Sequence, residues 1–208
     1  MTDTQARAPG RRDRKKQQTR AALIAAALRL VDERGLDRVT VEDISEAADV
    51  SPRTFFNYFA TKDEAITGGQ FVDDTDVLEL FLGAAPDVPV VAALLHALEP
   101  ALEKIQAEQE IWFLRMRVMT ENPSLVTGLL ARSAQAERDL VTAVATRAGV
   151  PADSAYPVVT ASVAGATVRA AMTRWAAGHG ARTLSDHVHE AFGVLATGLA
   201  DPTERERR

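Results

Sequence analysis

The chain has 208 residues, of which 46% are hydrophobic and 25% are charged, and these proportions are ordinary for a globular protein. It contains no cysteine, which excludes disulfides, thiolate metal sites and cysteine nucleophiles. The net charge is −5, but residues 1–20 carry seven Arg or Lys against two Asp, so a +5 segment precedes a −10 body and favours a polyanionic partner, although basic tails are also often merely solvated.

The amino-terminal end has a basic segment followed by a short apolar one, as a secretory signal does. However, Arg29 interrupts the apolar run, and Asp32 lies where a small-residue cleavage site is needed. No run approaches the ~18 uninterrupted apolar residues that cross a bilayer. We therefore expect a cytoplasmic protein with no membrane partner.

The first elements are a basic arm and a long helix. Residues 1–12 predict a disordered arm, and a helix is expected from about 13 to 34. Its apolar stripe consists of Ile24, Ala27, Leu28 and Val31. Gly35 ends it, because glycine is preferred just past a helix end.

Two short helices joined by a tight turn come next. They are expected at about 40–47 and 51–59, with the turn at 48–50. Their predicted caps are Thr40 and Ser51. Together with the first helix they make a three-helix helix-turn-helix domain over 13–60, in which the third helix enters the major groove of DNA.

Residues 61–200 predict a larger helical bundle, and residues 201–208 a charged tail. Thr61 and Glu64 form a capping box at the start of a helix that extends towards Leu82.

Later positions shape the rest of this bundle. Pro100 is expected to kink or split one helix, and Asn122 to cap another. Two more helices are expected at about 154–177 and 184–199. Since no segment alternates as a strand does, the predicted fold class is all-α.

The segment 51–59 gathers aromatic and polar side chains with helical spacing. Phe55 and Phe59 share one face and are expected to pack inward, while Arg53 and Asn57 lie on the other side. Arg can hydrogen-bond guanine O6 and N7, and Asn can bond adenine N6 and N7. Hydroxyls and the amino ends of helices suit phosphate oxygens. The candidate phosphate ligands from this chemistry are Ser51, Thr54, Tyr58 and Lys62.

The stretch TVEDISEAADVSPRTFFNYFATKDEAI resembles the signature of the TetR family of bacterial repressors, and the resemblance covers residues about 20–66. It implies that Arg53 and Asn57 read bases. It also implies phosphate contacts by Thr40, Thr54, Tyr58 and Lys62. Two positions depart from the family pattern. Asp49 replaces a turn glycine, which is tolerable because Asp visits left-handed geometry readily. Phe56 replaces a tyrosine, and we expect it simply to pack.

The resemblance also implies a helical carboxy-terminal domain that dimerises through its last two long helices and holds a small molecule. The segment TASVAGATVRAAM, residues 160–172, independently favours close helix packing because its residues are small. An intramolecular core is the alternative for these residues. The dimer-interface candidates are Ala161, Ala164, Gly165, Val168, Met172, Phe192 and Leu195.

Bulky apolar residues supply the candidates for a ligand pocket, although ordinary cores contain the same residue types. They are Phe81, Trp112, Phe113, Met116, Met119, Tyr156 and Trp175. The segment RMRVMTENPSLVTGLLARSAQAERDLVTAVATRAG is similar to the acyl-CoA-like ligand-binding domain of some actinobacterial TetR regulators. This similarity implies a long apolar tunnel, with Arg115 or Arg117 available to a polar head group.

Neither a metal site nor a catalytic site is expected. His187 and His189 are two apart on a helix, so they point in opposite directions, and we expect surface histidines without a metal or cofactor. The sequence offers no Ser–His–Asp set, paired inward carboxylates or glycine-rich phosphate loop, which disfavours an enzyme.

The function predicted is that of a homodimeric repressor, released from a palindromic DNA operator by a small apolar or acyl-type effector. A protein that coats DNA without base preference is the alternative, since it would use the same basic segment. A helical-bundle enzyme is a more remote alternative. Competition against random DNA over a range of salt concentrations separates the first two, because only specific binding keeps a large preference.

Overall fold

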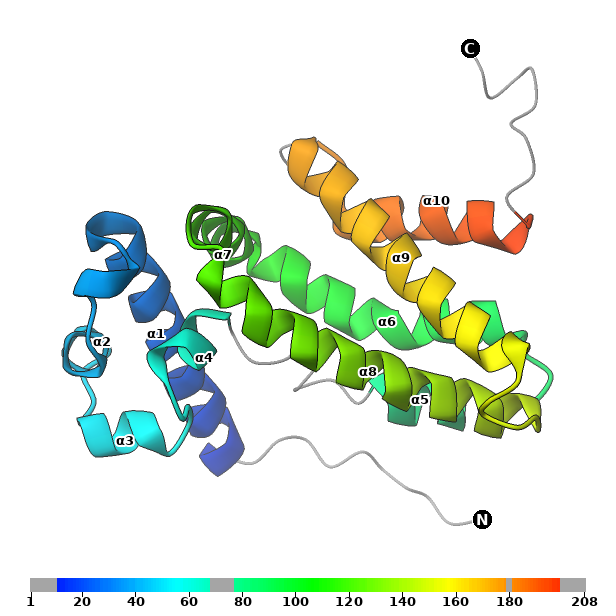
Figure 1. The fold of residues 1–208 in the computed structure, drawn as a ribbon, viewed down its shortest axis with the longest axis horizontal. Helices are drawn as coiled ribbons and strands as arrows, with labels where there is room; N and C mark the ends of the chain where they lie inside the picture. Colours follow the sequence, from blue (N-terminus) through cyan, green and yellow to red (C-terminus); the bar gives the residue numbers. More distant parts are fainter. Residues whose placement is uncertain (1–10, 68–76, 179–180, 199–208) are drawn as a thin grey trace. The chain divides into compact units, whose positions relative to one another are not determined.

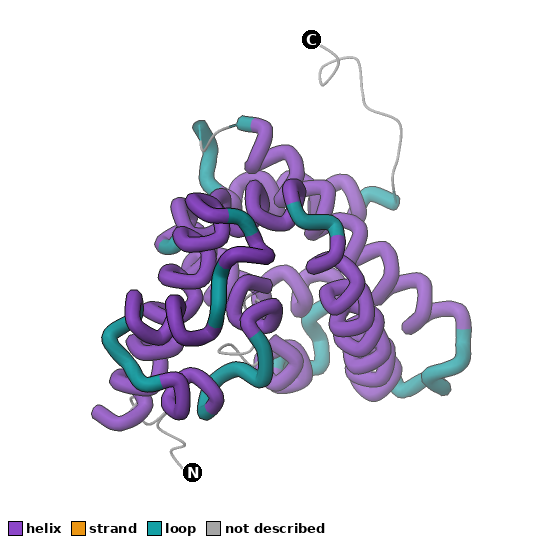
Figure 2. Tube along the Cα trace, turned by 60° about the vertical axis from the view of Figure 1, so that its left-hand side comes forward, coloured by secondary structure: helices purple, strands orange, loops and turns teal. Residues whose placement is uncertain are grey.

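In a computed structural model, the described residues are 11–67, 77–178 and 181–198, without the side chains of Arg11, Asp13 and 126–132. Of the predicted arm at residues 1–12, residues 1–10 lie outside them, as does the tail at 201–208, whereas Arg11 and Arg12 already belong to the first helix. Every regular element in the described residues is a helix (Figure 1, Figure 2). The chain divides into two compact units, residues 1–69 with 110–127 and residues 70–109 with 128–208.

The first unit contains the long helix α1 with three short helices beside it and one helix from later in the chain (Figure 1). These elements are α1 (Arg11–Arg34), the 3₁₀ turn η1 (Leu36–Arg38), α2 (Val41–Ala47), α3 (Pro52–Phe56), α4 (Lys62–Thr67) and α7 (Gln109–Glu121). Helix α1 packs against α2 and α4, and α2 packs against α3. Gly35 ends α1 with a φ of 83°, a conformation that glycine adopts without strain.

One apolar core holds this unit together. The stripe on α1 meets buried side chains of the short helices and of α7, among them Ile44, Phe55, Phe59, Ile66 and Val118. Because each short helix is too small to be stable alone, burial of these side chains against α1 stabilises all of them.

Helix α4 starts differently from its prediction. The Thr61 hydroxyl accepts from the backbone N–H of Glu64 at 3.1 Å, as a capping box requires. The Glu64 carboxylate instead accepts from the backbone N–H of Ala60 at 2.7 Å. Helix α4 is described as far as Thr67, and the continuation expected over 68–76 lies outside the described residues.

The second unit consists of longer helices: α5 (Val77–Gly83), α6 (Val90–Ala107), most of α8 (Ser124–Ala148), α9 (Ala155–Ala177) and α10 (Leu184–Ala196). Helix α10 packs against α6 and α9, and α5 packs against α6. The Arg147 guanidinium on α8 fastens the α5–α6 connection by donating to four backbone carbonyls. Their oxygens belong to Phe81, Ala84, Ala85 and Val88, at 3.3, 2.8, 2.7 and 2.8 Å.

Three expectations about this part of the chain are corrected. Helix α6 runs through Pro100 and is not split, and Pro100 lies on its exposed side. The Asn122 amide donates to Val118 O at 2.8 Å, so it caps the end of α7 and not the start of α8. His187 is only 8% exposed, because it shares the inward side of α10 with Leu184 and Val188.

Membrane spans and metal clusters are both absent from the described residues. None of their helices is both long enough and apolar enough to span a membrane. Within the same ranges, no group of three or more His, Asp or Glu side chains is placed to hold a metal ion.

Candidate nucleic-acid interface

Helix α2 and the turn after it are set by local hydrogen bonds. Thr40 caps α2, since its hydroxyl accepts from the backbone N–H of Asp43 at 3.1 Å, while the Asp43 carboxylate accepts from the backbone N–H of Thr40 at 2.9 Å. Asp49 takes left-handed geometry with a φ of 54°, as expected for the residue that replaces the turn glycine. Val50 N–H then donates to Ser45 O at 2.9 Å and brings the chain round to α3.

Helix α3 is anchored from behind by aromatic rings. Ser51 caps it by accepting from the backbone N–H of Thr54 at 3.1 Å, and Pro52 occupies the first helical position. Phe55 and Phe59 are 0% and 2% exposed, with ring centroids 5.7 Å apart. The short helix is therefore held in a fixed orientation by its own inward side.

The outward side of α3 carries the predicted base-reading residues. Arg53 and Asn57 are both exposed, while Thr54 and Tyr58 are half-buried beside them. Although α3 ends at Phe56, Asn57 keeps helical dihedral angles, and Phe59 N–H still donates to Phe55 O at 3.0 Å. The four-residue spacing of Arg53 and Asn57 therefore places both on one surface.

Phe56 does not pack as expected. Its side chain is 57% exposed, and its ring makes an edge-to-face contact with the buried Phe55, with ring centroids 5.5 Å apart. An apolar ring thus lies open on the helix that also presents Arg53 and Asn57. Phe56 follows Arg53 by three residues and so lies on the same side of the helix, which explains its exposure.

Four of the five predicted phosphate ligands have intramolecular partners. The hydroxyl of Thr40 donates to Asp43 at 2.6 Å, and this bond and that from the Thr40 backbone lower the pKa of the Asp43 carboxyl. The hydroxyls of Ser51 and Thr54 lie 2.9 Å apart. The Lys62 ammonium donates to Leu36 O at 2.8 Å and to Val39 O at 3.0 Å. Lys62 thus secures the segment between η1 and α2, a role that the sequence did not indicate.

Two arginines of α7 bind other parts of the first unit. Arg117 forms a two-pronged ion pair with Asp32 of α1, with both N···O distances 2.7 Å, and this pair lowers the pKa of the Asp32 carboxyl. Arg115 is 8% exposed and donates to Ile66 O at 3.2 Å. Both guanidinium groups are therefore engaged where a polar head group was expected to bind.

The dimer-interface candidates lie at different depths in the second unit. Ala161, Ala164 and Phe192 are 1%, 4% and 2% exposed, so they are covered by their own chain. The remaining four are half-buried: Gly165, Val168, Met172 and Leu195. The open apolar side chains on the same two helices are Tyr156, Val158, Val159 and Val194.

The pocket candidates differ in burial and belong to both units of the chain. Phe81 and Trp175 are 0% exposed in the second unit, where Tyr156 is 49% exposed. In the first unit, Trp112 and Met119 of α7 are buried, and Phe113 and Met116 are half-buried.

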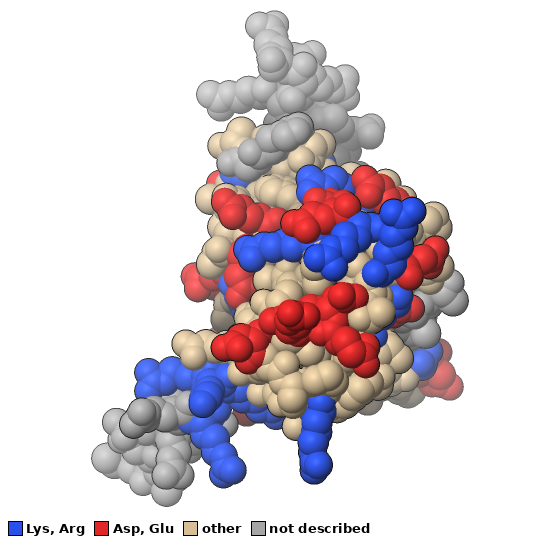
Figure 3. Space-filling model, turned by 90° about the vertical axis from the view of Figure 1, so that its left-hand side faces the viewer, with Lys and Arg blue, Asp and Glu red and all other residues tan. Residues whose placement is uncertain are grey.

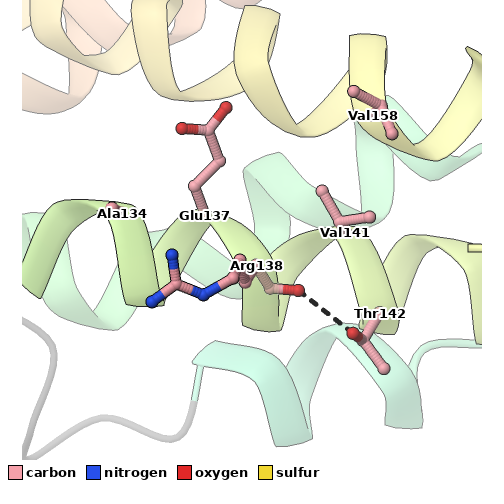
Figure 4. A pocket seen from close by; sticks show the side chains of 6 residues that line it. All are labelled: Ala134, Glu137, Arg138, Val141, Thr142 and Val158. Atoms are coloured by element: carbon pink, nitrogen blue, oxygen red, sulfur yellow. Dashed lines mark hydrogen bonds between the residues drawn. The ribbon is translucent and has the colours of Figure 1, made fainter. Parts of the chain in front are cut away.

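A hollow of about 500 Å³ lies between α8 and α9 (Figure 4). Its lining residues are Ala134, Glu137, Arg138, Val141, Thr142 and Val158, none of which was predicted. The Glu137 carboxylate accepts from the Ser162 hydroxyl across these two helices. The hollow combines an apolar floor with one acidic and one basic side chain, so it could hold an amphipathic molecule.

Comparison with known proteins identifies relatives of both parts of the chain. A family model for bacterial regulatory proteins of the tetR family matches residues 23–65, and one for the MftR C-terminal domain matches residues 88–200. The chain is similar to the HTH-type transcriptional regulator TcmR of Streptomyces glaucescens, with 34% identity over 155 residues, which are 71% of this chain and 68% of that protein.

Solved structures share the fold at lower identity. The fatty acid degradation regulator FadR of Bacillus halodurans has a TM-score of 0.59 and 18% identity, over 88% of this chain and 97% of that one. FadR of Thermus thermophilus, a repressor solved with lauroyl-CoA, has a TM-score of 0.52 and 22% identity, over 88% and 96%. Since the match at residues 88–200 covers more than half of the chain and the one at 23–65 covers the helix-turn-helix, this protein belongs to the TetR family of transcriptional regulators.

Proposed function

We propose that the protein is a homodimeric repressor that binds a palindromic operator through α3 and leaves it when a small apolar or acyl-type molecule binds. One observation carries the DNA-binding part. Arg53, Phe56 and Asn57 are exposed together, while Phe55 and Phe59 hold the helix rigidly from behind. A surface that is fixed, polar and open is what base recognition requires.

Each exposed group has a distinct task in this proposal. Arg53 donates two hydrogen bonds to a guanine, and Asn57 pairs with an adenine. The Phe56 ring contacts a thymine methyl group, which is the apolar feature of the major groove. Ser51, Thr54 and Tyr58 bind phosphates and fix the register of α3 on the duplex.

Thr40 and Lys62 are also assigned to phosphates, although both already donate hydrogen bonds within the chain. The single O–H of Thr40 already donates to Asp43, so it would bind a phosphate only by turning this donor away from the carboxylate. Lys62 donates to two carbonyls and retains one N–H for a phosphate. Each therefore has a structural role in the protein besides the phosphate contact that is proposed for it.

Dimerisation is assigned to α9 and α10. Their exposed apolar side chains, Tyr156, Val159 and Val194, support a contact with a second copy, because burial of such a surface is favourable. In the dimer, the two copies of α3 would enter successive major grooves about 34–36 Å apart, which requires a palindromic operator.

An apolar effector is supported by proteins of the same fold. The Thermus thermophilus repressor was solved with lauroyl-CoA, and SmeT, with a TM-score of 0.56 and 18% identity, was solved with triclosan. The effector would prefer a dimer whose two α3 helices no longer match the groove spacing, and so shift the population away from DNA. Mass spectrometry of molecules that co-purify with the protein tests this part.

The DNA-binding part is tested by selection from a library of random duplexes. The proposal predicts enrichment of one palindromic motif, with a preference over scrambled duplex that persists as salt is raised. The rival, a DNA-coating protein, is supported by the basic start of α1 and predicts no motif. Failure to enrich any sequence would therefore remove the repressor.

A further inference from the structure

The first turns of α1 carry exposed cations that none of the roles above uses. Arg12, Arg14, Lys15 and Lys16 are all exposed. In Figure 3, Lys and Arg side chains gather at lower left, and a band of Asp and Glu and a further group of Lys and Arg lie above them. Four exposed cations therefore lie within five consecutive residues at the start of α1.

This concentration is unfavourable for the isolated helix. Arg12 and Lys16 are four apart, and Arg12 and Lys15 are three apart, so like charges are neighbours on one side. They also lie at the end of the helix where the backbone dipole is positive. None of the four cations pairs with a carboxylate among the side chains that the structure describes. A polyanion would relieve both repulsions.

A row of cations on one side of α1, formed by Arg12, Lys16 and Arg20, leads towards the segment that carries α3. Arg20 follows Lys16 by four residues, so it lies on the same side of α1. Its guanidinium carbon is 5.3 Å from the centroid of the Phe59 ring, which anchors that segment. From Arg20 back to Arg12 the helix rises about 12 Å. Duplex DNA carries roughly seven phosphate charges over that length of its axis.

We propose that Arg12, Lys15 and Lys16 form a second DNA contact, which binds the phosphate backbone beside the base pairs that α3 reads. The inference rests on the function proposed above and adds a surface to it. Because phosphates carry no sequence information directly, this surface raises affinity for every sequence equally. It also releases counterions, which makes binding depend more steeply on salt.

The test compares two triple variants of the full chain. The first is Arg12→Gln, Lys15→Gln and Lys16→Gln. The matched control removes the same charge from exposed cations elsewhere, with Arg29→Gln, Arg38→Gln and Lys104→Gln. The probes are the duplex that the unaltered protein selects from a random library and a mixed-sequence duplex of equal length. Affinity is measured from low to high salt.

The first variant should bind both duplexes more weakly and keep its preference between them. The slope of log affinity against log salt should become shallower by roughly 0.9 for each phosphate that the variant no longer neutralises. The control should keep the slope of the unaltered protein. An unchanged slope in the first variant, an equal change in the control, or a loss of base preference would overturn the assignment.

A second measurement uses the unaltered protein and so does not depend on how the variants fold. Amide hydrogen exchange over residues 12–18 should slow when the selected duplex binds, because phosphates relieve the repulsion at the helix start. Exchange that is the same with and without DNA would contradict the proposed role of α1. If the unaltered protein selects no sequence, the proposed function fails. If it selects one while the slope and exchange stay unchanged, only the role of α1 fails.

Discussion

Phe56 exposes an apolar ring in a segment whose other two phenylalanines are buried. At 57% exposure, against 0% for Phe55 and 2% for Phe59, it contributes little to the core. We predict that it contacts a thymine methyl group in the operator. Replacing each operator thymine by uracil should then weaken binding of the unaltered protein at one symmetric position. The Phe56→Ala variant should be insensitive to that replacement.

The comparison combines two changes, loss of the thymine methyl group and loss of the Phe56 ring, and asks whether their effects on affinity depend on each other. Equal sensitivity of both proteins to loss of the methyl group would show that the ring contacts something else. Arg29→Ala is a suitable control, because it also truncates an exposed side chain of the first unit but lies outside α3.

Lys62 has a structural task that should be measurable without DNA. Its ammonium bonds to Leu36 O and Val39 O hold the 3₁₀ turn against the start of α4. Hydrogen bonds to charged groups contribute about 1.5–3 kcal/mol each, so Lys62→Gln, which removes the charge from two of them, should lower the free energy of unfolding by at least about 2 kcal/mol. Urea unfolding measures this, with Arg29→Gln as control. Unchanged stability would leave only the phosphate role.

Helices α2 and α10 start with the same local arrangement, in which a threonine caps the helix and an aspartate three residues on closes the box. Hydrogen bonds from Thr40 lower the pKa of the Asp43 carboxyl, and those from Thr183 lower the pKa of the Asp186 carboxyl. A folded pKa below the unfolded value of about 4 means that the stabilisation is present above that pH. It is lost as the pH falls through the folded pKa.

Acid unfolding therefore tests the two caps. Asp43→Asn and Asp186→Asn should each lower stability at pH 7 and flatten its decline at acidic pH, because the titrating carboxyl is gone. Urea unfolding at a series of pH values measures both effects. Asp37→Asn is a control on the exposed 3₁₀ turn. The assignment would be contradicted if a variant were less stable than the unaltered protein by the same amount at acidic pH as at pH 7.

Features that depend on neighbouring residues could be predicted from sequence, and features that depend on packing could not. The caps at Thr40 and Ser51 and the inward side of Phe55 and Phe59 follow from spacing, and the left-handed turn at Asp49 follows from the family pattern that has a glycine there. The burial of His187 depends on where its helix packs, which spacing cannot specify.

The same limit applies to exposure and to pairing across the fold. The openness of Phe56 depends on whether another part of the fold covers that side of α3. The hydrogen bonds of Lys62 and Arg117 join positions 26 and 85 residues apart in sequence, so no local pattern signals them. The burial of Ala161 and Ala164 depends on which side of α9 faces its own chain.

At the scale of the whole molecule, dimerisation is predicted to use the open side of α9. Val159 is 57% exposed there, so Val159→Glu places a charge in the proposed interface without disturbing the core. Sedimentation equilibrium should show a dimer for the unaltered protein and a shift towards monomer for the variant. The control, Gln135→Glu, adds a negative charge at an exposed position of α8, outside the proposed interface, and should remain dimeric. A dimer of unchanged strength in Val159→Glu would place the interface elsewhere.

Base reading by α3 is tested most directly by the affinity of the unaltered protein and of Arg53→Ala for a full set of single-base variants of the selected operator. The unaltered protein should prefer guanine at one symmetric position in each half-site. Arg53→Ala should lose about 1–3 kcal/mol of that discrimination and keep its preferences elsewhere. An Arg53→Ala protein with the same base preference at every position would contradict the role of α3 in reading DNA.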